Sequence, residues 1–390
     1  SGAGPIPRGW NHLQSGADLN DVIAGPTFGR LALSVPLLFF FIRAARLAAS
    51  ADTICSHWLA PAGVVGALCS MVLGKPHVVI EHSGSLHLLR RSKSGRLLAR
   101  FVTRHSKTIV TVSSDLKSKL IAICPEAATK TVVMSMGVYP WERRRLACQV
   151  KGSVNGGVMA GVNSGVKLVT RTGTMSDPDP VEAARAGQPR ATMAAAAVPG
   201  LPGFASGSCP PNKTHKILFI GRLVKIKGVD VLIRAVSELT DVELLIAGQG
   251  DQADFLKQLC KTLGLDARFL GPVAGTEARG KLYSDCDVVV VPSLILRDGR
   301  CEGMPRVCLE AMAAGKPLIA SASGGLAELI VDGHNGLLFE PGNHKMLAAK
   351  LRELLDNSEL SRLFSVRGRA TAAAYDWSRL GPAFSELIQG

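Results

Sequence analysis

The chain has 390 residues, of which 47% are hydrophobic and 5% aromatic, and it carries a formal net charge of +14. This length favours two domains, and the positive charge predicts an anionic partner, but so few aromatic residues argue against a protein that stacks single-stranded nucleic acid. The nine cysteines are odd in number and include no Cys-x-x-Cys pair, which predicts a reduced, intracellular protein with neither a disulfide framework nor a zinc site.

The N-terminal part of the chain contains its most apolar run. Residues 1–30 are rich in Gly and Pro without clear periodicity, and the apolar run follows at 31–42. It has about half of the ~20 residues that a transmembrane helix needs, and Arg43 and Arg46 follow at once. We expect a buried helix with a basic end at the surface; a helix that touches a membrane is the alternative.

Short apolar runs alternate with helical segments in residues 52–140. The strands are expected at Asp52–Ser56, His77–Glu81, Thr108–Val112 and Thr131–Met134, and the helices at Pro61–Leu73 and Ser113–Ile123. Ser113 or Ser114 is the expected N-cap of the second helix. This alternation predicts a parallel sheet with helices on both faces, and residues 1–140 are taken as the N-terminal domain.

The composition changes after residue 140. Gly, Ala, Pro, Ser and Thr dominate residues 143–215, and such a segment buries too little apolar surface to offset the entropy of ordering it. Residues 141–215 are therefore interpreted as a linker or a disordered insertion.

Strong secondary-structure signals return at residue 216. The strands are expected at ILFIG, VELLIAG, RFLG, DVVVVP, PLIAS and GLLFE, and the helices at Val229–Leu239, Asp251–Leu263, Thr276–Tyr283, Pro305–Ala314 and His344–Leu355. Uninterrupted Val, Ile and Leu in the strands indicate a sheet that is covered on both faces. Residues 216–372 therefore form a second doubly wound α/β domain, whose ligand is expected beyond the carboxyl ends of the strands.

Two cations follow the first strand of this second domain. Gly221 ends the strand and permits close approach of a ligand, Arg222 comes next, and Lys227 precedes Gly228 and a helix. Arg and Lys near a helix N-terminus suit a diphosphate. The alternative is a pair of solvated surface cations. The spacing is not that of a P-loop.

Two carboxylates stand eight residues apart in Glu302-Gly303-Met304-Pro305 and the helix that follows. Pro305 suits a first helical position, which leaves Glu302 in the preceding loop and Glu310 inside an apolar helix. A carboxylate there is costly unless it meets a hydroxyl or a cation, so the pair suits a hydroxyl-rich ligand. The alternative is a capping Glu302 and a structural Glu310.

Three further features surround this candidate site. Gly324-Gly325 follows a strand and can expose backbone N–H groups to an anion, or can simply begin a helix. His57-Trp58 and His82 follow strands of the first domain, so both histidines are expected to face the cleft, although a lone histidine is usually structural. A basic cluster either is a solvated helix face or meets anionic lipid or an acidic acceptor. Its members are Arg90, Arg91, Lys93, Arg96, Arg100, Arg104 and Lys107.

In combination, these motifs resemble the retaining GT-B glycosyltransferases of family 4, also called glycosyl transferases group 1. The resemblance rests in the second domain on ILFIGRLVKIKGVDVLIRAV, LLIAGQGD, EGMPRVCLEAMAAGKPLIAS and GGLAELIVDGHNGLLFEPGN, and more loosely in the first on SHWLAPAGVVGAL, GKPHVVIEHSG and TVSSDLK. Tyr375-Asp376-Trp377 and residues 373–390 resemble the last helix of the family, which crosses back to the N-terminal domain.

The resemblance implies two Rossmann-like domains that face a cleft, and a role for each site residue. Arg222 and Lys227 would hold the donor diphosphate beside Gly221, Glu302 the hydroxyls of the donor sugar, and Glu310 the ribose. The Gly303-Met304-Pro305 and Gly324-Gly325 turns would line the donor site. His82 would reach the transferred sugar, with His57 and Trp58 on the acceptor side. The family needs no metal and no cofactor, because the donor is a nucleotide-diphosphate sugar.

The predicted function is therefore transfer of a hexose-type sugar to a glycan or lipid-linked acceptor with retention of configuration. The cysteine pattern predicts a cytoplasmic enzyme, and the basic cluster suits peripheral contact with the inner membrane face. No nucleic-acid partner is expected, because no recognition motif accompanies the positive charge. Residues 1–30 show no strand followed by a Gly-rich loop, which the family has. A nucleotide-sugar-binding protein with impaired catalysis and a nucleotide-sugar epimerase are the alternatives.

Overall fold

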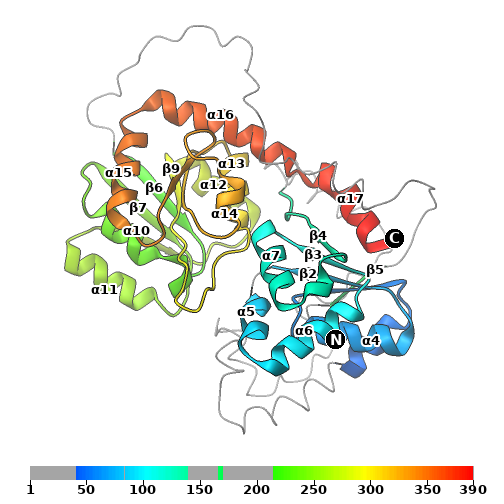
Figure 1. Ribbon diagram of the computed structural model, residues 1–390. Helices are drawn as coiled ribbons and strands as arrows, with labels where there is room; N and C mark the ends of the chain where they lie inside the picture. Colours follow the sequence, from blue (N-terminus) through cyan, green and yellow to red (C-terminus); the bar gives the residue numbers. More distant parts are fainter. Residues whose placement is uncertain (1–40, 83, 139–165, 170–213, 390) are drawn as a thin grey trace, which may run out of the picture.

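The computed structural model describes residues 41–82, 84–138, 166–169 and 214–389, and two α/β units lie side by side within them (Figure 1). The apolar run at 31–42 lies outside the described residues except for its last two positions. Residues 41–48 are helical, with Ala44 and Ala48 buried and Ile42 exposed. Among the helices that the structure describes, none is both long enough and apolar enough to cross a bilayer.

The first unit is built on a five-stranded sheet in the order β4-β3-β2-β1-β5. Its strands are β1 (Thr53–His57), β2 (His77–Glu81), β3 (Thr108–Thr111), β4 (Thr131–Val133) and β5 (Val166–Val169). Strands β1 to β4 are parallel, as predicted.

Strand β5 corrects one expectation. It pairs antiparallel with β1 and lies in the segment 141–215, so these four residues are not disordered, whereas the interpretation of the segment as a linker or insertion stays a prediction. The physical reason is that the outer edge of β1 presents unpaired backbone groups, which a short Val-Lys-Leu-Val run can satisfy. The boundaries predicted for the rest of this segment fall largely outside the described residues.

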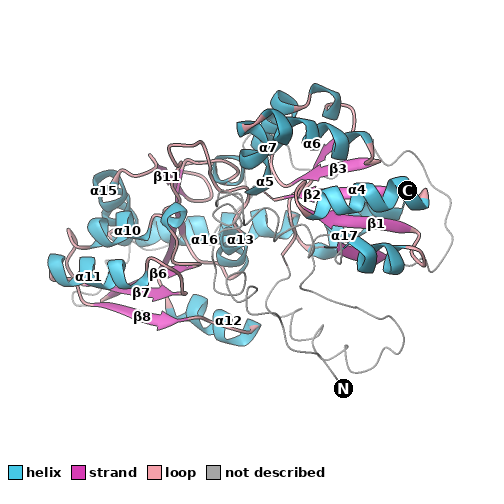
Figure 2. Cartoon of the chain, turned by 90° about the horizontal axis from the view of Figure 1, so that it is seen from below, coloured by secondary structure: helices cyan, strands magenta, loops and turns pink. Residues whose placement is uncertain are grey.

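Helices cover both faces of this first sheet (Figure 2). They are α4 (Ala62–Leu73), α5 (Gly84–Arg91), α6 (Lys93–Arg104), α7 (Ser114–Ile123) and α17 (Trp377–Gln389). Val79 of β2 packs in one cluster with residues of α4, α5, α6 and α7, whereas its neighbours Val78 and Ile80 pack against Leu387 of α17. The last helix of the chain therefore supplies one of the layers that bury the first sheet.

The return of the chain to the first unit is fixed by backbone hydrogen bonds. The Val138 N–H donates to the Tyr375 carbonyl at 2.8 Å, and the Trp377 N–H donates to the Val138 carbonyl at 3.1 Å. Gly137 is required here, because a Cβ at this position would lie 2.7 Å from the Trp377 ring. The crossing thus follows Tyr375-Asp376-Trp377, where the family resemblance implies it.

The second unit is built on a six-stranded parallel sheet in the order β11-β10-β9-β6-β7-β8. Its strands are β6 (His215–Ile220), β7 (Val242–Ala247), β8 (Ala267–Gly271), β9 (Val288–Val291), β10 (Leu318–Ser321) and β11 (Leu337–Phe339). Its helices are η3 (Lys225–Lys227), α10 (Val229–Val236), α11 (Ala253–Leu263), α12 (Thr276–Asp285), α13 (Arg306–Ala313), α14 (Leu326–Leu329), α15 (His344–Leu355) and α16 (Ser358–Ala374).

Both faces of this second sheet are buried. On β6, Ile217 belongs to the cluster that contains α10, α11 and α15, whereas Leu218 belongs to the cluster that contains α12, α13 and α14. The predicted fold class, α/β with two doubly wound domains, is therefore confirmed. The strand order reverses between the neighbours β6 and β9, and ligands of such sheets bind at this switch point, beyond the carboxyl ends of the strands.

Candidate functional site

The loops that follow β6, β7 and β9 pack backbone against backbone at the switch point. A Cβ on Gly248 would lie 1.8 Å from the Gly221 carbonyl oxygen, and a Cβ on Gly228 would lie 2.0 Å from that of Pro292. Gly228 also has a φ of 62°, which favours glycine. These glycines allow the three loops to pack closely. The packing fixes the backbone positions from which the Arg222 and Lys227 side chains extend.

The two predicted cations have different surroundings. Lys227 is half-buried, and its Nζ lies 2.9 Å from Oε1 of Glu302, which comes from the loop between β9 and α13. Arg222 is exposed, and among the described residues no carboxylate forms an ion pair with it. The structure thus pairs one of the two predicted cations, Lys227, with one of the two predicted carboxylates, Glu302. It leaves the Arg222 side chain accessible to a ligand.

Glu310 meets both kinds of partner that its buried position requires. It lies in α13, is 1% exposed, and accepts a hydrogen bond from the Tyr283 hydroxyl at 3.2 Å. The Arg279 guanidinium lies 3.4 Å from its other oxygen. Burial and the Glu310 carboxylate raise the pKa of Tyr283 far above its usual range, so this hydroxyl stays protonated and donates.

The sequence did not reveal Arg279 and Tyr283 as partners of Glu310. They stand four residues apart on α12, so they share one helix face, and that spacing is the signal that could have found them. The described contacts of Glu310 are those of a structural carboxylate, which the sequence left open as an alternative to ribose binding.

The opposite wall of the cleft carries the two predicted histidines. His57 Nδ1 lies 2.7 Å from His82 Nε2, and the two rings stack with their centroids 5.0 Å apart. Trp58, which follows β1, is 42% exposed, and its ring centroid lies 5.9 Å from that of His82 in an edge-to-face arrangement. The structure therefore brings all three acceptor-side residues together.

A buried glutamate that the sequence did not single out organises this wall. Glu81, at the end of β2, accepts a hydrogen bond from the Leu59 N–H at 2.9 Å and another from the Ser85 hydroxyl. Its carboxylate thereby ties the loop after β1, which carries Trp58, to the start of α5. The strand-end position just before His82 is the sequence signal for such a role.

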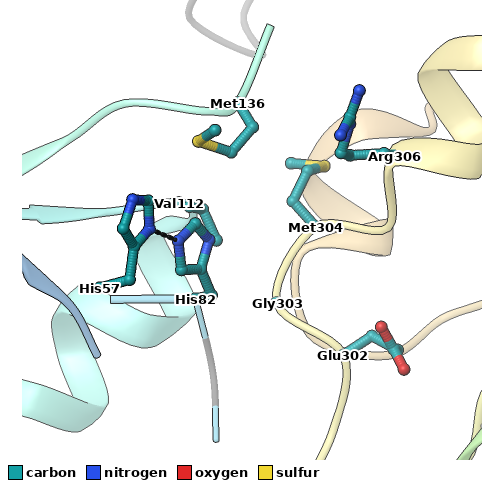
Figure 3. Close-up of a pocket in the computed structure, with 8 residues that line it drawn as sticks. All are labelled: His57, His82, Val112, Met136, Glu302, Gly303, Met304 and Arg306. Atoms are coloured by element: carbon teal, nitrogen blue, oxygen red, sulfur yellow. Dashed lines mark hydrogen bonds between the residues drawn. The ribbon is translucent and has the colours of Figure 1, made fainter. Parts of the chain in front are cut away.

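The two walls enclose a cavity of about 350 Å³ (Figure 3). His57, His82, Val112 and Met136 line it from the first unit, and Glu302, Gly303, Met304 and Arg306 line it from the second. The units touch at Gly303, where a Cβ would lie 2.1 Å from the His82 carbonyl oxygen. Pro305 is the N-cap of α13 with extended dihedrals, not its first helical residue, because its ψ of 120° is outside the helical range.

The predicted Gly324-Gly325 turn rests on the Glu302 loop. A Cβ on Gly324 would lie 2.1 Å from the Glu302 carbonyl oxygen, and one on Gly325 would lie 1.7 Å from that of Gly303. The turn therefore holds the loop that presents Glu302. Among the described residues, no group of three or more His, Cys, Asp or Glu side chains could hold a metal ion.

Two family models match this chain in succession. Residues 8–141 match Glycosyltransferase Family 4, and residues 208–371 match Glycosyl transferases group 1. The chain belongs to this glycosyltransferase family. The second match includes every predicted donor-site residue, and the first includes His57, Trp58 and His82.

Relatives of this glycosyltransferase include proteins of archaea and bacteria. An uncharacterized glycosyltransferase of Methanocaldococcus jannaschii is 26% identical over 329 residues, which cover 84% of this chain and 72% of that protein. The D-inositol 3-phosphate glycosyltransferase of Corynebacterium jeikeium is 32% identical over 192 residues, but the match covers only 46% of this chain and 44% of that protein.

Solved structures establish the architecture of the glycosyltransferase. Anabaena HepE in complex with UDP-glucose superposes with a TM-score of 0.62 at 20% identity, over 89% of this chain and 81% of that chain. Sucrose-phosphate synthase of Thermosynechococcus elongatus gives a TM-score of 0.60 at 19% identity, over 86% and 73%. The GT-B architecture implied by the sequence resemblance is confirmed.

Proposed function

We propose that this glycosyltransferase moves a hexose-type sugar from a nucleotide-diphosphate sugar to a glycan or lipid-linked acceptor, with retention of configuration and without a metal ion. The observation that carries the proposal is the cavity between the units, which is lined by His82 on one wall and by Glu302, the partner of Lys227, on the other. The HepE structure of the same fold holds UDP-glucose, which supports the donor class.

Donor binding rearranges the Lys227–Glu302 pair. Arg222 offers a planar fork of N–H donors to the diphosphate, and Lys227 adds a point charge. As the phosphate attracts Lys227, the Glu302 carboxylate gains the capacity to accept hydrogen bonds from sugar hydroxyls. The two residues of this ion pair therefore bind the two ends of the donor: Lys227 the diphosphate and Glu302 the sugar. Before the donor binds, Glu302 neutralises the charge of the half-buried Lys227.

Catalysis in this proposal is electrostatic. The bond between the anomeric carbon and the diphosphate oxygen breaks, a bond to the acceptor oxygen forms on the same face, and the acceptor proton passes to the leaving diphosphate. Arg222 and Lys227 stabilise the charge that develops on that diphosphate. Glu302 and His82 position the sugar, and His57 orients His82 through the hydrogen bond between their rings.

The test combines donor binding with turnover. A nucleotide sugar at about 100 times its Kd adds about 2.7 kcal/mol of stability, so thermal-shift screening of several nucleotide sugars is expected to identify the donor. Release of nucleoside diphosphate is then expected to require an acceptor and to be unchanged by excess EDTA. An NMR assay of the product reports whether the anomeric configuration is retained.

Three outcomes would contradict this proposal. Conversion of the sugar without any acceptor would indicate an epimerase, and tight donor binding without diphosphate release would indicate a binding protein. Loss of activity in EDTA, restored by a divalent cation, would contradict metal independence. The comparisons favour neither the epimerase nor the binding protein.

We also propose that the first unit contacts an anionic membrane surface through α6 and its surroundings. All seven residues of the basic cluster are exposed, and between them on α6 lie Leu97 and Leu98, which are 64% and 41% exposed. A helix with exposed leucines among cations suits the interface of an anionic bilayer. The proposal places a lipid-linked acceptor within reach of the first unit.

Replacing Arg96 by glutamine is expected to weaken sedimentation with phosphatidylserine vesicles about fivefold, since each basic residue near the surface contributes about 1 kcal/mol. The matched control is Lys261→Gln on α11 of the second unit, which removes the same charge and is expected to change nothing. Binding that is insensitive to added salt, or equal for both variants, would rule out this surface.

A further inference from the structure

Glu328 of α14 reaches from the second unit to the first. Its Oε2 accepts a hydrogen bond from the Ser114 N–H and its Oε1 accepts one from the Asp115 N–H, both at 2.8 Å. These two N–H groups belong to the first turn of α7, and Figure 1 shows α14 next to α7. A single carboxylate thus binds two consecutive backbone donors across the boundary between the units.

The N-terminus of α7 is suited to this contact. The first N–H groups of a helix have no partner within the helix, and its dipole favours negative charge at that end. The Ser113 hydroxyl satisfies the Leu116 N–H, so the Ser114 and Asp115 N–H groups remain for Glu328. The partners of Glu328 are backbone N–H groups, so the positions of these donors are set by helix α7 as a whole.

The segment that carries Glu328 also touches the candidate active site. Gly324 and Gly325 precede it and rest on the backbone of Glu302 and Gly303. Gly325 also lies close to the first unit, since a Cβ on it would be 3.1 Å from the Ser113 Cβ. One short segment therefore contacts both the loop of Glu302 and the start of α7.

A second polar contact supports the same boundary. Lys119, one helical turn after Asp115 on α7, places its Nζ 2.9 Å from the Cys301 thiol, the residue before Glu302. Lys119 is itself held by Asp115 at 2.6 Å. Both ends of the site loop are thus connected to α7, at Cys301 directly and at Gly303 through the Gly324-Gly325 turn.

From these contacts we propose that Glu328 is a positioning residue: its carboxylate holds the start of α7 and thereby keeps the Glu302 loop against the histidine wall during transfer. The inference rests on the proposed function. Glu328 contacts no part of the reacting groups, so it acts on the assembly of the two walls. Donor binding to the second unit does not require it.

The test uses two variants that remove opposite sides of the contact. Glu328→Gln removes the charge, and Ser114→Pro removes the N–H and places the ring where Oε2 lies. Proline is tolerated at the first helical position after an extended residue, and Ser113 has extended dihedrals of −153° and 159°. Ser358→Pro is the matched control, at the first position of α16 after the extended Asn357.

Both Glu328→Gln and Ser114→Pro are expected to lower kcat by about tenfold, because each weakens a charge-assisted hydrogen bond, while the Kd for the nucleotide sugar changes by less than about twofold. Ser358→Pro is expected to match the parent in both. Unchanged kcat in either Glu328→Gln or Ser114→Pro would overturn the proposal. So would a parallel loss of donor affinity, which would indicate damage within the second unit.

Hydrogen exchange separates this inference from the proposed function, because it needs no substrate. In the full chain, Glu328→Ala is expected to speed amide exchange at Ser114 and Asp115 but not at Leu116, whose N–H is held by Ser113. If the exchange rates stay the same, the contact does not form in solution and the inference fails. If they rise while no sugar transfer is found for the parent, only the proposed function fails.

Discussion

Replacing Lys227 by alanine is expected to lower kcat/KM for sugar transfer by about 10²–10³-fold, more than the same change at Arg222. Both variants lose a cation that stabilises the leaving diphosphate. Lys227→Ala also strips Glu302 of its partner at 2.9 Å, so an unpaired carboxylate repels the incoming phosphate. Arg222 is exposed and has no such partner among the described residues, so its removal adds no repulsion.

A double variant tests this reasoning. Adding Glu302→Gln to Lys227→Ala is expected to restore part of the donor affinity, measured by calorimetry, although kcat stays low because the sugar hydroxyls lose a charged acceptor. Lys225→Ala is the matched control, since Lys225 is two residues away and pairs with Asp230 at 2.8 Å. If Lys227→Ala and Arg222→Ala bound the nucleotide sugar as tightly as the parent, the donor site would lie elsewhere.

Glu310 is the residue whose replacement is expected to affect both stability and donor binding. Glu310→Ala removes the buried carboxylate that accepts hydrogen bonds from the Tyr283 hydroxyl and the Arg279 guanidinium, and we expect it to lower the free energy of unfolding by about 3 kcal/mol. Glu310→Gln keeps one acceptor oxygen and is expected to cost about half as much. Urea denaturation measures both values.

Comparing Glu310→Gln with Tyr283→Phe separates the two roles of this carboxylate. If Glu310 binds the ribose of the donor, Glu310→Gln is expected to weaken nucleotide-sugar binding about tenfold, because a charged acceptor is lost. Tyr283→Phe removes only the structural hydrogen bond, so it is expected to lower stability and to leave the donor Kd within about twofold. Equal donor affinity in both variants would show that Glu310 is structural alone.

The helices and strands are the part of this fold that is most predictable from the sequence. His77–Glu81 and His344–Leu355 have the predicted bounds, and Ser113 is the N-cap of α7, one of the two residues expected. These features depend on local rules: an unbroken apolar run forms a buried strand, and a Ser hydroxyl satisfies the first N–H groups of a helix. Pro305 was misplaced by one residue, because proline satisfies the geometry of both an N-cap and a first helical position.

Strand β5 shows where local rules fail. Val166–Val169 lies in a segment of Gly, Ala, Ser and Thr whose average composition predicts no packed structure. These four residues pair with the free edge of β1, which belongs to a sheet whose strands come from a distant part of the sequence. A window of sequence around the strand contains no information about that edge.

The pattern of residues along the chain is enough to predict the two doubly wound units and the positions, at strand ends and in one loop, of the residues that carry charge in the candidate site. The tertiary structure decided how those charges are paired: Lys227 with Glu302, Glu310 with Tyr283 and Arg279, and Glu328 with the start of α7. The reason is that secondary structure follows neighbours in the chain, whereas an ion pair or a buried hydrogen bond depends on which loops the completed sheets bring within a few ångströms.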